Sequence, residues 1–135
     1  MTRVLALCAD LLFGSKMVAQ LAAAGEQLEL SGDAGAARER LNVPDGPQVL
    51  VVDLTDERLD GAALVQSLRD GSQVSGSGVR VPRTLGFYSH VDAAARQRAE
   101  AAGFDVVVPR SRMAREGAEL VAGLFEEAPA RRSSG

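Results

Sequence analysis

Short apolar runs alternate with segments of helical periodicity along the whole chain. The clearest run covers residues 49–52, four consecutive apolar residues that are followed at once by Asp53. A continuous valine-rich run of this length is typical of a strand that is buried on both faces. Four other segments also have the character of strands: residues 3–9, 27–30, 84–89 and 105–108.

Between these runs, apolar residues recur at intervals of three and four, which predicts amphipathic helices. The helices expected from this spacing cover residues 14–24, 34–41, 62–69, 92–102 and 112–127. Asp60 is the expected N-cap of the third helix. Strands that alternate with helices indicate parallel strands joined by right-handed crossovers. At 135 residues this predicts one α/β domain, a doubly wound five-stranded parallel sheet of the flavodoxin-like kind, with strand order 2-1-3-4-5 and helices on both faces.

Two segments stand apart from this pattern. Residues 70–82 are rich in glycine and serine and long for a connection in a compact domain. We interpret them as a mobile surface insertion at the amino-end edge of the sheet, with a partner-binding loop as the alternative. Residues 128–135 contain a proline, two arginines, two serines and a glycine, and are predicted as a disordered tail. The folded domain is therefore expected to cover residues 1–127.

Composition narrows the classes of function. A formal net charge of −3 and an aromatic content of 4% disfavour binding to nucleic acid. No apolar stretch approaches the roughly 20 residues that a membrane-spanning helix needs, and the first residues lack the layout of a signal peptide. A single cysteine, Cys8, fits a reducing cytosol, so a cytoplasmic protein is expected. His90 is the only histidine, which leaves no Ser/His/Asp triad and no Cys/His metal cluster, and we expect no enzymatic activity.

Asp53 occupies the position at which a sheet of this kind carries its chemistry. It follows the central buried run directly. Ligands of open parallel sheets bind beyond the carboxyl ends of the strands. Asp53 is therefore expected at the functional edge of the fold.

The spacing around Asp53 resembles that of the receiver domains of bacterial two-component response regulators, the CheY-like family. In receivers, the aspartate that ends the third strand accepts a phosphoryl group, and an Asp-Gly pair follows seven and eight positions later, as Asp60-Gly61 does here. Ser89 matches the hydroxyl residue that contacts the phosphoryl oxygens, and Arg110 stands where receivers carry a lysine. The resemblance covers residue 3 to about residue 127. It implies that Asp53, Ser89 and Arg110 lie together at one rim of the sheet.

The sequence departs from the receiver pattern where receivers hold magnesium. Their pair of acidic residues at the end of the first strand reads Cys8-Ala9 here, and Asp10 comes one residue late. Arg110 replaces the lysine, Glu57 replaces a loop proline, and Val107 replaces an aromatic residue of the fifth strand. The chain therefore looks like a degenerate receiver, or pseudo-receiver.

These departures leave open what the individual side chains do. No metal site is expected, and the weak candidates for Mg²⁺ are Asp10, Asp53 and the backbone carbonyl of Thr55. Asp10 is interpreted first as an exposed turn residue. For Arg110 two interpretations remain, a bidentate clamp on Asp53 and a solvated position in a turn. Cys8 is interpreted as an inert packing residue rather than a reactive thiol.

Together these observations favour a stand-alone, atypical receiver-like signalling protein that acts through protein–protein contact and without phosphorylation. The expected partner is another protein or a second copy of the chain, and neither nucleic acid nor membrane. Two alternatives remain. One is an active phospho-acceptor, in which a histidine kinase serves Asp53 with Mg²⁺ as the cofactor. The other is a small-molecule-binding domain on the same fold.

Overall fold

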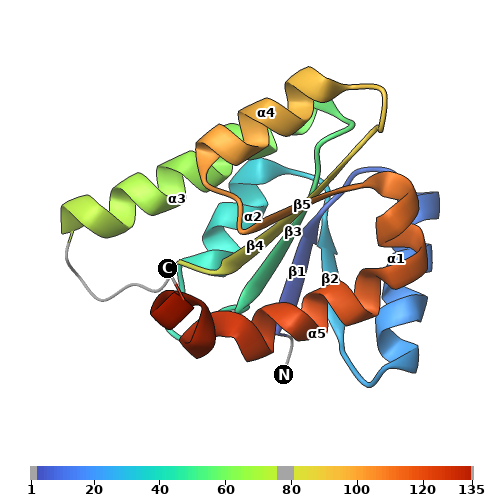
Figure 1. Ribbon diagram of the computed structural model, residues 1–135, viewed down its shortest axis with the longest axis horizontal. Coiled ribbons are helices and arrows are strands. Elements are labelled where there is room, and N and C mark those ends of the chain that lie inside the picture. Colours follow the sequence, from blue (N-terminus) through green and yellow to red (C-terminus); the bar gives the residue numbers. More distant parts are fainter. Residues whose placement is uncertain (1–2, 76–80, 135) are drawn as a thin grey trace.

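A computed structural model describes the backbone of residues 3–75 and 81–134 and the side chains of residues 3–71 and 81–125. Five strands pair in parallel in the order β2-β1-β3-β4-β5 (Figure 1). The strands are β1 (Val4–Leu7), β2 (Leu28–Ser31), β3 (Val49–Asp53), β4 (Arg83–Tyr88) and β5 (Val106–Pro109). The predicted α/β class, parallel sheet and strand order are confirmed.

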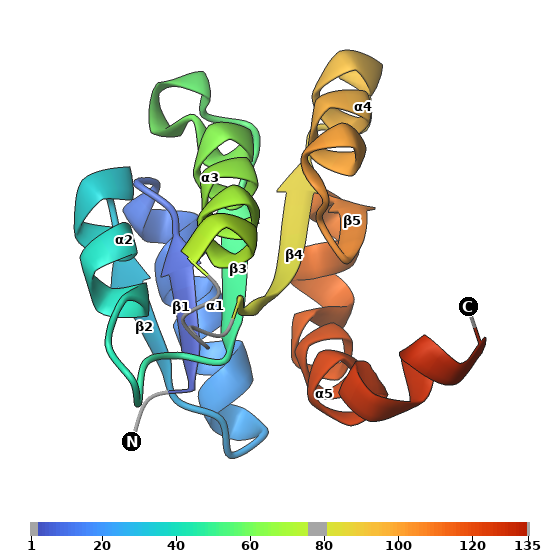
Figure 2. The ribbon, with the colours of Figure 1, turned by 90° about the vertical axis from the view of Figure 1, so that its left-hand side faces the viewer.

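Helices cover both faces of this sheet. They are α1 (Leu11–Ala23), α2 (Ala34–Leu41), α3 (Gly61–Ser75), α4 (Ala93–Ala102) and α5 (Arg110–Ser134), with a 3₁₀ turn η1 (Glu57–Leu59) before α3. Helices α1 and α5 pack on one face, and α2, α3 and α4 on the other (Figure 1). The carboxyl ends of β3 and β4 lead into α3 and α4 at the upper end of the molecule in Figure 2.

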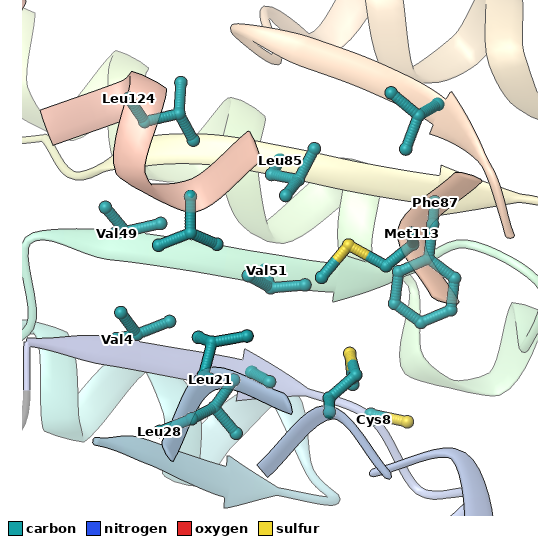
Figure 3. Packing of buried hydrophobic residues seen from close by; sticks show 14 of the residues in the cluster. Val4, Cys8, Leu21, Leu28, Val49, Val51, Leu85, Phe87, Met113 and Leu124 are labelled. Atoms are coloured by element: carbon teal, nitrogen blue, oxygen red, sulfur yellow. The ribbon is translucent and has the colours of Figure 1, made fainter. Parts of the chain in front are cut away.

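The alternation of side chains along each strand explains why both faces are covered. In β1, Val4 and Ala6 face the α1 and α5 side, whereas Leu5 and Leu7 face the other helices, and all four are fully buried. Figure 3 shows the first side, where Leu21 of α1 lies over the strands beside their valines. Burying a leucine or valine side chain contributes about 1.5–3 kcal/mol. A strand without polar positions is therefore stable only between two layers of helices.

Helices α1 and α3 have boundaries that differ from the sequence predictions. Helix α1 begins at Leu11 rather than at residue 14, because the Asp10 carboxylate accepts hydrogen bonds from the amides of Leu12 and Phe13 and caps the helix. Helix α3 continues to Ser75, so residues 70–75 are helical and not part of a loop. The remainder of the predicted surface insertion includes residues 76–80, which lie outside the described part of the chain.

Helix α5 is also longer than predicted. It begins at Arg110 rather than at residue 112, has a kink at Glu116, and continues to Ser134. Its side chains from residue 126 onward lie outside the described part of the chain. The predicted disordered tail over residues 128–135 therefore remains a prediction.

The Asp60-Gly61 pair has a backbone role at the start of α3. Asp60 ends η1 in the left-handed conformation, with φ 49°, and does not cap α3 in the extended conformation that is usual for an N-cap. A Cβ atom on Gly61 would collide with Cγ1 of Val52 in β3. The close approach of α3 to β3 therefore explains the glycine. Asp60 stands at the predicted N-cap position, because its carbonyl accepts from the Leu64 amide at 3.2 Å, but in a left-handed rather than an extended conformation.

Candidate functional site

Asp53 is the central side chain at the carboxyl edge of the sheet. Only 3% of its surface is exposed. Its Oδ1 accepts hydrogen bonds from the backbone amide of Thr55, at 2.8 Å, and from the Thr55 hydroxyl, at 2.5 Å. The Cys8 thiol has two acceptors within reach, Oδ2 of Asp53 at 3.7 Å and the backbone carbonyl of Asp10 at 3.5 Å, and shares its one proton between them. Both carboxylate oxygens of Asp53 are thus occupied by donors of this chain.

Cys8 reaches Asp53 because it directly follows β1, and Asp53 is the last residue of the neighbouring strand β3. β1 pairs with β3 in a register that matches Leu7 with Val52, so the next residue of each strand lies side by side. Burial, and secondly the charge of Asp53, raise the pKa of the Cys8 thiol to about 11. The thiol is therefore protonated at neutral pH and is a hydrogen-bond donor rather than a nucleophile. The high pKa supports the prediction that the Cys8 thiol is inert. The contact of Cys8 with Asp53 was not predicted from the sequence.

Arg110 pairs with Asp10 and not with Asp53. Its Nη2 lies 3.1 Å from Oδ2 of Asp10, and its guanidinium carbon lies 4.4 Å from the centre of the Phe13 ring. Hydrogen bonds from the Phe13 amide, and then the charge and hydrogen bond of Arg110, lower the pKa of Asp10. Neither interpretation from the sequence describes this arrangement, because Arg110 neither clamps Asp53 nor lies free in solvent. Asp10 is exposed as predicted, but it is both a helix cap and an ion-pair partner.

Two adjacent pockets open at this edge. One, of about 520 Å³, is lined by Ala9, Asp10, Asp53, Thr55, Asp56, Glu57 and Arg58. The other, of about 420 Å³, is lined by Phe13, Thr55, Ser89, His90, Arg110, Ser111 and Ala114. Thr55 lines both pockets. Asp53 therefore lies at the same edge as Ser89 and Arg110, but in a neighbouring pocket, and the predicted roles of these three residues remain predictions.

The resemblance to receivers implies a Mg²⁺ ion held by carboxylates at this edge, and the side chains present do not fit one. Mg²⁺ requires several oxygen ligands in near-octahedral geometry. Asp10 uses one carboxylate oxygen to cap α1 and the other to bind Arg110. Asp53 directs both oxygens at Thr55 and Cys8. Within the described residues, no three acidic, cysteine or histidine side chains are grouped so that they could hold a metal ion.

Asp56, another acid of the first pocket, is also engaged. Asp56 caps η1 through the Arg58 amide and pairs with the Arg58 guanidinium at 3.1 Å. This pairing lowers the pKa of Asp56. The pocket thus combines negative side chains with arginines that already neutralise two of them.

In residues 3–75 and 81–134, none of the helices has the length and apolar character of a membrane span.

Among the comparisons with known proteins, the one with solved structures shows the fold. A scan against protein-family models found no match, and a search of curated proteins found none either. Among solved structures, the receiver domain of the Francisella response regulator 1452 is similar, with a TM-score of 0.76 and 17% identity over 94% of this chain and 98% of that one. A two-component response regulator from Legionella pneumophila has a TM-score of 0.71 and 14% identity over 93% and 99% of the two chains.

The receiver domain of NtrX from Brucella abortus gives a similar result. Its TM-score is 0.75, with 16% identity over 93% of this chain and 99% of that one. Identities this low show a shared fold and do not transfer activity. The chain therefore has the CheY-like fold of response-regulator receiver domains.

Proposed function

We propose that this chain is an atypical receiver-like signalling protein that acts by docking on a protein partner without phosphorylation of Asp53. The observation that carries the proposal is the state of Asp53, which is 3% exposed and is hydrogen-bonded through both oxygens to Thr55 and Cys8. Phosphoryl transfer to a carboxylate brings two negative groups together and depends on positioned positive charge. The arginines of the two pockets, Arg58 and Arg110, are each paired with a different aspartate.

The charges on α4 and α5 support docking as the mode of action. Both helices carry exposed arginines, namely Arg96, Arg98, Arg112 and Arg115. Arg96 pairs within its own helix with Glu100 at 3.1 Å, and Arg112 and Arg115 pair with Glu116 at 3.3 and 3.7 Å. Arg98 lies on the flank of α4 toward α3, where it lines a pocket with Asp60 and Gly61. Arginine is enriched at protein interfaces. Val91, just before α4, is 79% exposed and offers an apolar side chain to a partner. The face suits an acidic surface on a partner or on a second copy.

A second candidate function is phospho-acceptance at Asp53. It is favoured by the pocket next to Asp53, where the Ser89 hydroxyl and the Arg110 guanidinium line the same wall as Thr55. In that case Arg110 would have to leave Asp10 and turn toward Asp53. A histidine kinase would then be the natural partner.

We expect affinity capture to separate docking from phosphorylation. The tagged chain and its Asp53→Asn variant should retain the same partner from the native lysate in equal amounts, because the carboxamide of the variant keeps the shape of the edge without accepting a phosphoryl group. The double substitution Arg96→Glu and Arg112→Glu should lower the retained amount roughly tenfold by reversing charge on the docking face. Quantitative mass spectrometry of the retained proteins gives the measurement.

The control for this experiment is Arg38→Glu, which reverses an exposed charge on α2, on the opposite side of the fold from α5. It should leave the retained amount unchanged. Loss of the partner with Asp53→Asn alone, or a chain that is monomeric and retains nothing, would count against docking as the function.

A further inference from the structure

We propose that the Cys8 thiol and the Arg110 guanidinium together replace a divalent cation at the functional edge, so that the edge is organised without Mg²⁺. The inference rests on the proposed function in treating Asp53 as a structural carboxylate rather than a phospho-acceptor. The receiver fold implies a Mg²⁺ ion beside Asp10 and Asp53, whereas hydrogen-bond donors of this chain surround both carboxylates. Each aspartate is held by groups of this chain, in a different way.

The first half of the replacement is at Asp53. A buried carboxylate is stable only when each oxygen has a donor or a cation. Thr55 supplies two donors to Oδ1, and the Cys8 thiol, which is shared with the Asp10 carbonyl at 3.5 Å, supplies the donor to Oδ2. Cys8 is itself 2% exposed, and its backbone amide is tied to the Ser31 carbonyl at 2.8 Å. The thiol is therefore fixed in place by the sheet, as a bound ion would be fixed by its ligands.

The second half is at Asp10. Oδ1 of Asp10 caps α1, and Oδ2 binds Arg110, the first residue of α5. The guanidinium rests on the Phe13 ring, which in turn packs against Phe87 with the ring centres 4.9 Å apart. A positive charge held on an aromatic face beside a carboxylate is positioned from two sides. Arg110 thus joins α1 to α5 across the edge of the sheet.

Residue 8 decides whether this edge needs a cation. The Cys8 sulfur is 3.7 Å from Oδ2 of Asp53, so an aspartate at position 8 would place a second negative charge next to the first. Two carboxylates at that separation repel strongly in a site shielded from water. Mg²⁺ relieves such repulsion because it takes carboxylate oxygens as ligands. The exchange of a thiol for a carboxylate should therefore convert a cation-independent edge into a cation-dependent one.

Thermal unfolding of the wild type, Cys8→Ser and Cys8→Asp, each in EDTA and in millimolar MgCl₂, tests the proposal. The wild type and Cys8→Ser, which keeps a donor at position 8, should unfold at the same temperature in both buffers, within about 1 °C. Cys8→Asp should lose about 5 °C or more in EDTA and regain at least half of the loss in MgCl₂, but not in NaCl of equal ionic strength. Cys8→Asn is the neutral control and should not respond to MgCl₂.

A second readout keeps the proposal falsifiable if Cys8→Asp fails to fold. The Thr55 amide donates to Asp53, so its ¹⁵N–¹H resonance reports on any ion that reaches that carboxylate. In the wild type this resonance should not move on titration with MgCl₂. A saturable shift, stabilisation of the wild type by MgCl₂, or a folded Cys8→Asp without a Mg²⁺ response would each overturn the proposal. None of these outcomes bears on partner capture by Asp53→Asn, so the two proposals fail separately.

Discussion

Replacing Asp105 with alanine is expected to lower the free energy of unfolding by about 3 kcal/mol. The Asp105 side chain is 8% exposed. Its Oδ2 accepts from the amide of Thr84 at 2.8 Å and from the Thr84 hydroxyl at 3.1 Å, and that hydroxyl accepts from the Asp105 amide at 2.9 Å. Thr84 is fully buried. Alanine would leave the buried Thr84 amide and the proton of the Thr84 hydroxyl without their acceptor, which costs more than the original bonds contributed.

Two arginines add to the expected loss. Arg69 and Arg83 each direct a guanidinium at Oδ1 of Asp105, at 3.6 and 3.8 Å, and both are partly shielded from solvent. Asp105→Asn keeps one acceptor for Thr84 but removes the charge, and should lose about half as much as the alanine variant. Urea unfolding followed by circular dichroism gives both values. A loss below about 1 kcal/mol for Asp105→Ala would show that this network contributes little.

Gly61→Ala is expected to destabilise the fold by about 3 kcal/mol and to disturb the edge that holds Asp53. The added methyl group would collide with Cγ1 of Val52, a fully buried residue in the middle of the sheet. Neither side has room to move, because Val52 is fixed by the strands on both sides of β3. The start of α3 would therefore shift outward, away from the strand that carries Asp53.

A double-mutant cycle separates this collision from the general cost of changing a glycine. Val52→Ala removes the methyl group that meets residue 61. Gly61→Ala should therefore lower the free energy of unfolding less in the Val52→Ala background than in the wild type, by about 1 kcal/mol or more. Gly71→Ala is the matched control, because a Cβ atom at that helical position meets nothing within 4 Å. It should be neutral or slightly stabilising. Additive effects of Gly61→Ala and Val52→Ala would contradict the proposed collision.

Much of the fold could be predicted from local pattern. The helix over residues 34–41 and the strand that ends at Asp53 have the predicted bounds, because strong periodicity and turn signals surround both. Helix α3 was cut short in the prediction, because residues such as Gly71 have low helix propensity. A penalty of about 1 kcal/mol for a glycine is small enough for a helix that packs along its length to continue through it.

The pairings at the functional edge could not be predicted in the same way. Arg110 and Asp10 are 100 residues apart, and Cys8 and Asp53 are 45 apart. The resemblance to receivers predicts by position that Arg110 acts beside Asp53. Arg110 pairs with Asp10 instead because α1 begins early, at Leu11, and because the Phe13 ring lies beneath the guanidinium. The contact of Cys8 with Asp53 could have been inferred from the predicted strand order, since β1 and β3 are neighbours and both residues lie at the carboxyl ends of these strands.

The proposed function requires that the Asp53 carboxylate is already occupied, and treatment with a small phosphodonor tests this directly. The purified chain and Asp53→Asn would be incubated with acetyl phosphate and MgCl₂, and their intact masses measured over time beside a typical receiver domain as a positive control. We expect the receiver to gain a phosphoryl group and both forms of this chain to keep their original mass. A phosphoryl adduct on the wild type that is absent from Asp53→Asn would contradict the account.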